Sequence, residues 1–446
     1  MSRLKMRGFG LPAVVLAALY VACADPPKKL PPTDGSAGSS GVIGEAGASD
    51  GGDATSGSSG AGAPGGAGGS AGSTASAGKG GQTESGGEGP IVGEGGASGA
   101  TSEAGAGGSA EPDACSTTTV GGKSSLPVPS TTGVVKPSGV PGTLKVVDWA
   151  GFKGALSFTF DDSLGSQINH YPELNAVGVP MTFYMVCAND SNKVFWTKVA
   201  HDGHEIGNHT MHHCFSYTAV GGSCDWGVSL GAGPELDVCT THIEEQLGVK
   251  GVYSMASPQG DAGWGVPAES RFLVNRGISD TPGGVAPNDS TNAWNLPCHL
   301  ANEAEKAVGG FNLITDSVRT NGSWRIILNH SVIAAGESND GYHPVDPAEV
   351  VAAMTYAKGK LDVWVDTVTS IGAYWRAQKV VSTAALVQIG SDQVFSWTLP
   401  DNFPPGQYLR VTVAGGTVKQ CGTPLTWDTH GYYEVALDAG ALTISP

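Results

Sequence analysis

A short apolar and β-branched run, Phe158-Thr159-Phe160, ends abruptly in two adjacent carboxylates, Asp161 and Asp162. An apolar strand that stops at a carboxylate pair places charged groups at the point where the strand leaves the core. In α/β enzymes, the carboxyl ends of parallel strands are where the catalytic side chains collect. The pair therefore predicts an α/β fold with its functional residues at one edge of the sheet.

A histidine-rich run follows downstream, with the sequence Gly203-His204-Glu205-Ile206-Gly207-Asn208-His209-Thr210-Met211-His212-His213. His209 and His213 are four residues apart, so in a helical conformation both imidazoles would point in the same direction. One carboxylate and two imidazoles, with room for water, form the ligand set of a catalytic divalent metal ion. The two motifs together predict such a site.

From Lys153 onward, short apolar runs alternate with helix-like stretches. The expected strands are 155–160, 181–186, 251–255, 325–328 and 362–365. The expected amphipathic helices are 166–177, 193–201, 235–247, 301–319 and 347–360. Strands that alternate with helices of this length indicate βα units and a parallel sheet or barrel. We therefore expect an α/β fold, an irregular (β/α) barrel over residues 145–378 that is either eight-fold or slightly trimmed.

The pattern changes after Ala377, where no helical period is evident. Short β-like runs cover 380–387, 393–399, 407–413 and 432–436, and they predict a small all-β C-terminal module over residues 379–446. Five aromatic residues of this module could either stack on sugars or form its core, and both interpretations stay open: Trp397, Tyr408, Trp427, Tyr432 and Tyr433.

The N-terminus reads as an export signal over residues 1–23, because basic residues precede a short apolar run that ends at Cys23. The end of this run, Tyr20-Val21-Ala22-Cys23, resembles a bacterial lipobox, in which the cysteine is lipidated and becomes the new N-terminus. Ordinary secretion is the alternative. We expect an exported protein, held at the outer surface or in the periplasm as a lipoprotein, or else secreted.

Residues 24–114 are expected to form a disordered tether, because glycine, alanine and serine dominate and large apolar side chains are almost missing. Between Thr33 and Asp113 lie ten acidic residues and one lysine, so this tract carries about nine of the 17 net negative charges. The remainder is mildly acidic and has no basic footprint for nucleic acid. A membrane partner is expected only through a lipid anchor at Cys23.

Eight cysteines are present, and in an exported protein disulfides are the default. Cys214 and Cys224 flank a glycine-rich loop directly after the histidine run and are the best candidate pair. Excluding Cys23 leaves an odd number, so at least one thiol is expected to stay free unless it pairs between chains.

The motifs Thr159–Asp162 and Gly203–His213, in this order, resemble the signature of the polysaccharide deacetylases, the NodB-homology or carbohydrate esterase family 4 proteins. Further downstream, Ile326-Ile327-Leu328-Asn329-His330 resembles the late strand of that family, and residues 364–375 resemble its closing strand and helix. The resemblance covers roughly residues 150–378. It implies a barrel of the polysaccharide deacetylase type.

The resemblance also implies a role for each site residue. Asp162, His209 and His213 would bind a divalent metal ion, zinc from the ligand set, with cobalt or manganese as alternatives. Asp161 would be the general base, and His330 the general acid that protonates the leaving group. Three other histidines are expected to be structural or to line the substrate site, because three ligands already complete the metal site: His204, His212 and His343.

One departure from the family pattern concerns the arginine that usually orients the base. The family's third motif reads Arg-x-Pro-x-Gly, whereas the matching stretch here is Ala256-Ser257-Pro258-Gln259-Gly260. The Gln259 backbone N–H could still contribute to an oxyanion site. Asp280 is a candidate for the fourth motif, without the usual nearby tryptophan.

The resulting hypothesis is a metal-dependent hydrolase that removes N- or O-linked acetyl groups from a carbohydrate polymer. The alternative is a catalytically silent carbohydrate-binding protein on the same fold, which the missing arginine at Ala256 favours. Either way the expected partner is an acetylated carbohydrate.

Overall fold

The computed structural model describes residues 124–302 and 310–446. The predicted export signal, Cys23 and the predicted tether lie outside these residues. Of the helix expected over 301–319, residues 303–309 also lie outside, and residues 301 and 302 are not helical. Within the described part, no helix is both long and apolar enough to cross a membrane.

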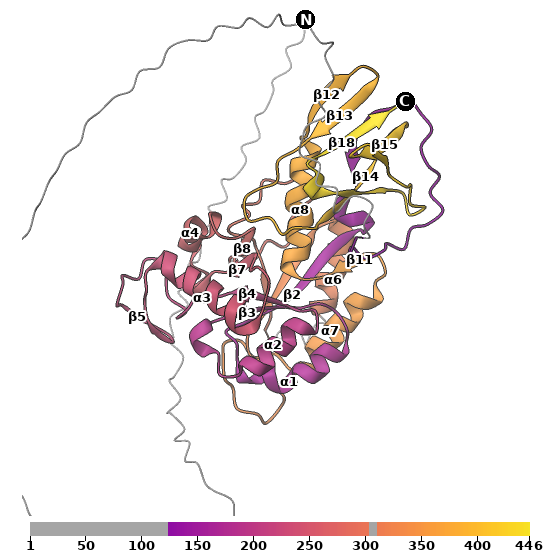
Figure 1. Cartoon of the computed structure of the whole chain (residues 1–446). Coiled ribbons are helices and arrows are strands. Elements are labelled where there is room, and N and C mark those ends of the chain that lie inside the picture. Colours follow the sequence, from indigo (N-terminus) through magenta and orange to yellow (C-terminus); the bar gives the residue numbers. More distant parts are fainter. Residues whose placement is uncertain (1–123, 303–309) are drawn as a thin grey trace, which may run out of the picture. The chain divides into compact units, whose positions relative to one another are not determined.

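The main sheet has eight strands and every pairing in it is parallel (Figure 1). Its strands are β2 (Gly154–Asp161), β3 (Thr182–Met185), β4 (Glu205–Asn208), β7 (Ser254–Ala256), β8 (Val274–Arg276), β9 (His299–Leu300), β10 (Trp324–Asn329) and β11 (Val363–Val365). Seven of them follow the order β8-β7-β4-β3-β2-β10-β9, and β11 lies off this path and pairs with β2. An isolated parallel bridge between Arg276 and Leu296 joins the β8 edge to the chain just before β9. The expected (β/α) barrel is therefore confirmed as a curled sheet of parallel strands.

Strand β2 is the centre of this sheet, and all eight of its residues are buried. One edge of β2 pairs with β10, while the other is shared by β11 near its start and β3 near its end. Leu156, Phe158 and Phe160 belong to one hydrophobic cluster, and Ala155 belongs to the other. Since side chains alternate along a strand, Asp161 continues the Ala155 face.

Helices connect the strands, as the alternating pattern predicts. They are α1 (Gly165–Ala176), α2 (Lys193–His201), α3 (Ala232–Leu247), α4 (Gly265–Glu269), α6 (Gly310–Asn321), α7 (Pro347–Gly359) and α8 (Val368–Ser382). Short 3-10 turns occur at η1 (Asp148–Gly151), η2 (Cys187–Asn189), η3 (Pro258–Gly260), η4 (Ala262–Trp264) and η5 (Leu437–Ala439). A small hairpin, β5 (Ser223–Cys224) with β6 (Gly227–Val228), follows the histidine run.

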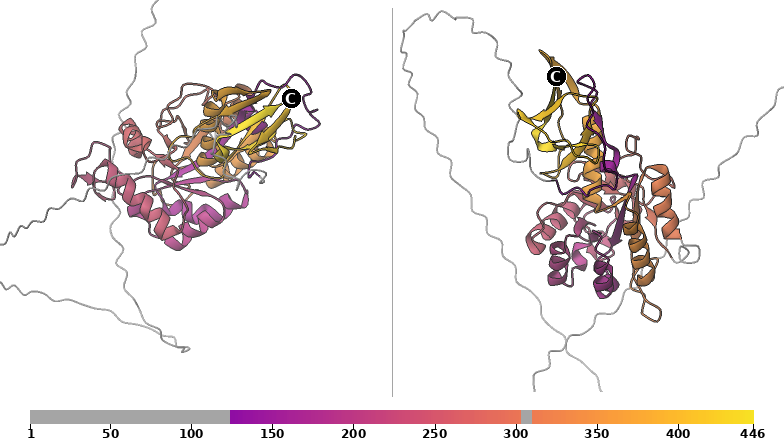
Figure 2. Two further views of the ribbon diagram at one scale, coloured as in Figure 1. Left: turned by 45° about the horizontal axis from the view of Figure 1, so that its top comes forward. Right: turned by 90° about the vertical axis from the view of Figure 1, so that its right-hand side faces the viewer.

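The C-terminal strands form two antiparallel sheets, which Figure 2 shows as orange and yellow arrows. One sheet contains β12 (Ala385–Ile389), β13 (Asp392–Ser396), β18 (Ala441–Ser445), β15 (Thr417–Gln420) and β16 (Thr423–Pro424). The other contains β1 (Lys145–Val146), β14 (Tyr408–Thr412) and β17 (Tyr433–Ala436). The β-rich module is confirmed, although the strand expected over 380–387 begins only at Ala385, because α8 continues to Ser382.

The module shares its core with the main sheet. Leu409 and Val435 lie in the same hydrophobic cluster as Ala155. The buried Arg410 donates to the carbonyl of Ala150, and β1 pairs with β14 although it lies before β2 in the chain. Three of the five aromatic candidates, Trp397, Tyr432 and Tyr433, are buried, so for them the core interpretation holds rather than the sugar-stacking one.

Candidate active site

The end of β2 and the turn after it present the two carboxylates, which lie 3.5 and 3.4 Å from the same atom, His209 Nε2. Asp161 is the last residue of β2 and is 2% exposed, whereas Asp162 adopts a left-handed conformation with φ of 78°. Such a conformation is unusual for a residue with a side chain and needs support from its surroundings. Asn189 donates to the Asp162 carbonyl at 2.8 Å, and Gln167 donates to the Asp161 carbonyl at 2.5 Å. These bonds hold the backbone of the turn from which both carboxylates extend.

The turn after β4 presents His209 and His213, and it is not helical. The side chain of Asn208, the last residue of β4, accepts from the Thr210 N–H at 2.8 Å, and the Thr210 hydroxyl accepts from the His213 N–H at 2.9 Å. Thr210 and His213 have φ values of 67° and 56°. The expectation that a helix aligns the two imidazoles is therefore wrong, because side-chain hydrogen bonds form a tight loop instead.

Gly207 explains why β4 can lie so close to its neighbour. A Cβ atom at this position would lie 2.5 Å from the ring of Tyr184, the residue beside it on β3. Only glycine fits this approach, which brings the end of β4 beside the end of β2 through β3.

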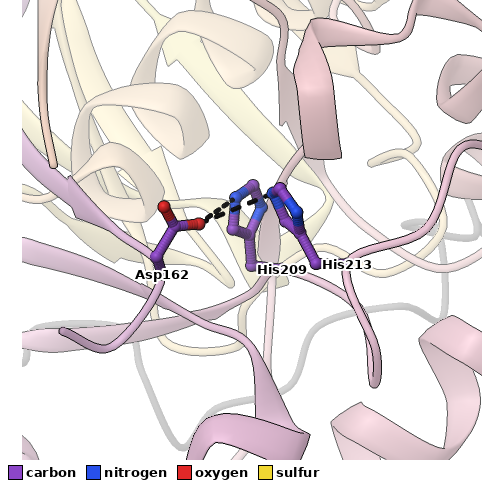
Figure 3. Close-up of side chains that lie close together, drawn as sticks. All are labelled: Asp162, His209 and His213. Carbon is purple, nitrogen blue, oxygen red and sulfur yellow. Dashed lines mark ion pairs between the residues drawn. The ribbon is translucent and has the colours of Figure 1, made fainter. Parts of the chain in front are cut away.

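Asp162, His209 and His213 converge on one point (Figure 3). The Nε2 atoms of His209 and His213 lie 3.4 and 3.5 Å from the Asp162 Oδ1 atom, and one donor atom from each residue lies within 4.8 Å of the others. Asp162 Oδ1 is buried and has no hydrogen-bond partner among the described residues. A buried carboxylate oxygen without a hydrogen-bond partner that faces two imidazole nitrogens is the arrangement that a divalent metal ion requires. The three residues therefore fit a metal site.

Both imidazoles are oriented through their other nitrogen. His209 Nδ1 lies 2.9 Å from the carbonyl oxygen of Ala256, and His213 Nδ1 lies 2.6 Å from the Asp225 carboxylate. A proton on each Nδ1 leaves the lone pair of each Nε2 facing Asp162. Asp225 was not singled out from the sequence, where it stands as one acidic residue in a polar loop.

The charges of the site favour an ionised Asp162. Burial raises the pKa of Asp162, but the nearby imidazoles of His209, His213 and His330 lower it well below its ordinary value overall. Burial lowers the pKa of His213, yet Asp225 and Asp162 raise it above its ordinary value overall.

Asp161 is bound by an arginine, although Ala256 occupies the position where the family pattern has one. Arg276, at the end of β8, donates to Asp161 Oδ2 and is fully buried. Ala256 and Arg276 are paired residues on neighbouring strands. Burial lowers the pKa of Arg276, but the Asp161 carboxylate raises it above its ordinary value overall, so the guanidinium stays charged. Arg276 therefore supplies the guanidinium that Ala256 cannot supply.

The other carboxylate oxygen of Asp161 is not used by Arg276. Asp161 Oδ1 is buried and has no hydrogen-bond partner among the described residues. Asp161 Oδ2 also lies 3.5 Å from His209 Nε2. One oxygen of this carboxylate is held by a guanidinium, and the other is unpaired and lies beside the candidate metal site. Such a carboxylate can accept a proton.

His330 follows β10 and stands near the two carboxylates. Gln167 donates to its carbonyl oxygen at 3.0 Å, and its Nδ1 atom is buried without a hydrogen-bond partner in the described part of the chain. Burial lowers the pKa of His330, against the charges of Asp162 and Asp161. Its ring lies 5.5 Å from that of the exposed Tyr342.

The three remaining histidines divide into two groups. His204 accepts from the Met181 N–H and pairs with Asn175, and His212 pairs with the buried Glu235 at 2.9 Å, so both have structural contacts. The ring of His343 lies 4.0 Å from that of Tyr342. Its predicted place along the substrate site stays a prediction.

The two candidates from the third and fourth motifs lie in different contacts. The Gln259 side chain donates to Asp225 at 2.8 Å. Asp280 accepts from Arg325 at 2.8 Å and pairs with His299 at 2.9 Å.

Two disulfides hold the loops of this edge. Cys214–Cys224 forms as predicted and closes the loop after the histidine run, and Cys187–Cys239 joins η2 to α3. Cys421 is also disulfide-bonded, and the free thiol of Cys298 is buried beside Arg276.

The fold and the donor set define an α/β protein with a candidate metal site at the carboxyl ends of its parallel strands. Residues 151–228, which include β2, β3, β4 and the three candidate metal ligands, match the family model of polysaccharide deacetylases. This segment therefore belongs to the polysaccharide deacetylase family.

Solved structures with similarity to the chain include three from this group. A T48 deacetylase with substrate is 19% identical, covering 49% of this chain and 91% of its own, with a TM-score of 0.32. A family 4 acetyl xylan esterase from Clostridium thermocellum with cobalt is 20% identical, covering 49% and 89%, with a TM-score of 0.31. A family pseudoenzyme from Bacillus anthracis is 14% identical, covering 53% and 70%, with a TM-score of 0.32. No curated protein matches the chain.

Proposed function

We propose that this protein is a metal-dependent hydrolase that removes acetyl groups, N- or O-linked, from a carbohydrate polymer. The observation that carries the proposal is the arrangement of Asp161, with one oxygen held by Arg276 and the other unpaired beside the Asp162–His209–His213 group. The family match of the same segment supports the substrate class.

Each residue of the site has a separate role in the proposed reaction. Asp162, His209 and His213 would hold the metal ion, which supplies Lewis-acid polarisation of an acyl oxygen and of water. Two nitrogen donors and one oxygen donor suit zinc, with cobalt or manganese as alternatives. Asp161 would accept the proton of the attacking water at Oδ1, while Arg276 orients the carboxylate through Oδ2. His330 would donate a proton to the departing amine or alkoxide.

The test is acetate release from acetylated chitin oligomers and from acetylated xylan, measured with added zinc and with chelator. We expect zinc-dependent release from at least one of the two substrates. Asp161→Asn should keep the metal and lose most turnover, because the amide retains the shape of the carboxylate but cannot accept the proton. Asp237→Asn serves as a control, since Asp237 pairs with Arg271 on an exposed surface. Normal turnover in Asp161→Asn would exclude Asp161 as the base.

The second candidate is a silent carbohydrate-binding protein. The missing arginine at Ala256 favours this alternative. The guanidinium of Arg276 weakens the argument, because it contacts Asp161 in place of the missing arginine. A wild type that holds zinc and binds the oligomers but releases no acetate from either substrate would establish this second function.

We also propose export with lipidation of Cys23, so that residues 24–114 act as a tether. The short apolar run before Cys23 and the composition of residues 24–114 support this arrangement. Detergent-phase partitioning of the wild type is its test.

A further inference from the structure

The loop that follows His213 folds back, so that its last residues contact the His213 side chain. Cys214 is bonded to Cys224, ten residues further on, and Asp225 follows immediately. Asp225 Oδ2 lies 2.6 Å from His213 Nδ1, and the Trp226 ring packs against the His213 ring at 5.3 Å and 79°. The Trp226 N–H donates to the carbonyl of His212 at 3.3 Å. The residues just beyond the disulfide therefore contact the imidazole from two directions.

The two histidine ligands are supported in different ways. His209 Nδ1 bonds to the carbonyl of Ala256, which belongs to β7 in the main sheet. His213 Nδ1 bonds to a side chain on the hairpin β5–β6, whose strands have two residues each. A two-residue hairpin has little stability of its own, so its position depends on other bonds. The Cys214–Cys224 disulfide is the covalent one.

Asp225 has a second contact that fits a positioning role. The Gln259 side chain donates to Asp225 Oδ2 at 2.8 Å, which ties the hairpin to the loop after β7. The Asp225 side chain is 26% exposed, and that of His213 is 10% exposed. The carboxylate thus lies at the rim of the site, with its acceptor oxygen directed at the inner imidazole.

We propose that Asp225 is the positioning residue for His213, and that the Cys214–Cys224 disulfide holds Asp225 in place, so that metal affinity depends on the oxidation state of this loop. The proposal rests on the metal site of the proposed function. A carboxylate on Nδ1 fixes the tautomer and ring orientation of a ligand histidine and increases its basicity. Loss of such a partner typically weakens metal binding by about 10–100-fold.

The experiment is a zinc titration of the full chain against a chromophoric chelator, which needs no turnover. Asp225→Asn and Asp225→Ala should each weaken zinc binding by about 10–100-fold. The matched control is Asp428→Asn, because Asp428 pairs with Nδ1 of His430 at 2.5 Å in the C-terminal module. Wild-type affinity in both Asp225 variants would overturn the positioning role.

The disulfide is tested by the Cys214→Ser/Cys224→Ser variant. This variant should lose zinc affinity by a factor similar to that of Asp225→Ala. The triple variant, which combines Asp225→Ala with both serine substitutions, should lose little more, because both changes act on the contact between Asp225 and His213. Fully additive losses, or wild-type affinity without the disulfide, would overturn the coupling. Urea unfolding of the metal-free proteins separates a general loss of stability from a loss of metal binding.

The failure of this inference differs from the failure of the proposed function. A wild type that binds zinc but releases no acetate leaves the Asp225 result intact. A wild type that binds no zinc overturns both.

Discussion

Replacement of Arg276 by alanine tests the most unusual contact of the site. Arg276 is fully buried and its charge partner Asp161 is 2% exposed, so neither group can turn to solvent when the other is removed. Removing one partner of a buried ion pair costs about 3–5 kcal/mol, since it leaves an uncompensated charge. We expect Arg276→Ala to lose this much unfolding free energy in the metal-free protein.

Turnover should fall as well, because Asp161 loses the donor that orients it. A positioned base contributes about 10²–10⁴-fold to the rate, which sets the upper limit of the loss. The assays are urea unfolding in the presence of chelator and acetate release at saturating zinc. The effect should lie mainly in kcat, since Arg276 contacts Asp161, the proposed base, and is not part of the candidate metal group.

A compensating change distinguishes orientation of the base from simple packing. Ala256 and Arg276 are paired on adjacent strands and both are fully buried, so their side chains can exchange places. The double variant Ala256→Arg/Arg276→Ala should regain turnover that Arg276→Ala lacks. Equal kcat in Arg276→Met and wild type would refute the reasoning, because methionine fills the space without supplying a charge.

Three further outcomes are expected. His209→Ala/His213→Ala should lose most bound metal, and full occupancy by elemental analysis would exclude the assigned site. Burial lowers the pKa of His204 to about 4 from 6.5, so below pH 6.5 the unfolded chain takes up a proton that the folded chain refuses. Stability should therefore fall by up to about 3 kcal/mol as pH drops from about 6.5 to about 4, and His204→Gln should lack this part of the dependence in urea titrations. Cys23→Ser should move the protein from the detergent phase to the aqueous phase, whereas a wild type that is wholly aqueous would support secretion without an anchor.

The sequence pattern predicted five of the eight strands of the main sheet, but not β4, β8 and β9. The residues of β4, Glu205–Asn208, read as polar, and the reason they form a strand lies elsewhere in the chain. Glu205 accepts from Thr182 at 2.9 Å and from Ser254 at 2.5 Å, so neighbouring strands satisfy the carboxylate. A pattern of hydrophobicity along one segment contains no information on such partners.

In the candidate site, too, some residues can be predicted from the sequence and others cannot. Asp161, Asp162, His209 and His213 come from two local motifs, and the structure brings them together. The loop geometry of the histidines could not be predicted from their separation, because side-chain bonds from Asn208 decide it. Asp225 and Arg276 reach the site from segments with no motif of their own.

Arg276 shows why a motif can be missing while its function remains. A barrel directs side chains from several strands at one interior point, so a carboxylate on β2 can be reached from β7 or from β8. Asp161 faces inward because it continues the alternation of β2, and Arg276 packs against the Tyr184 ring at 5.3 Å, beside the same carboxylate. Asp161 requires a positively charged partner, but that partner can come from either β7 or β8. An alanine in the third motif is therefore compatible with an oriented base, provided that the adjacent strand ends in arginine.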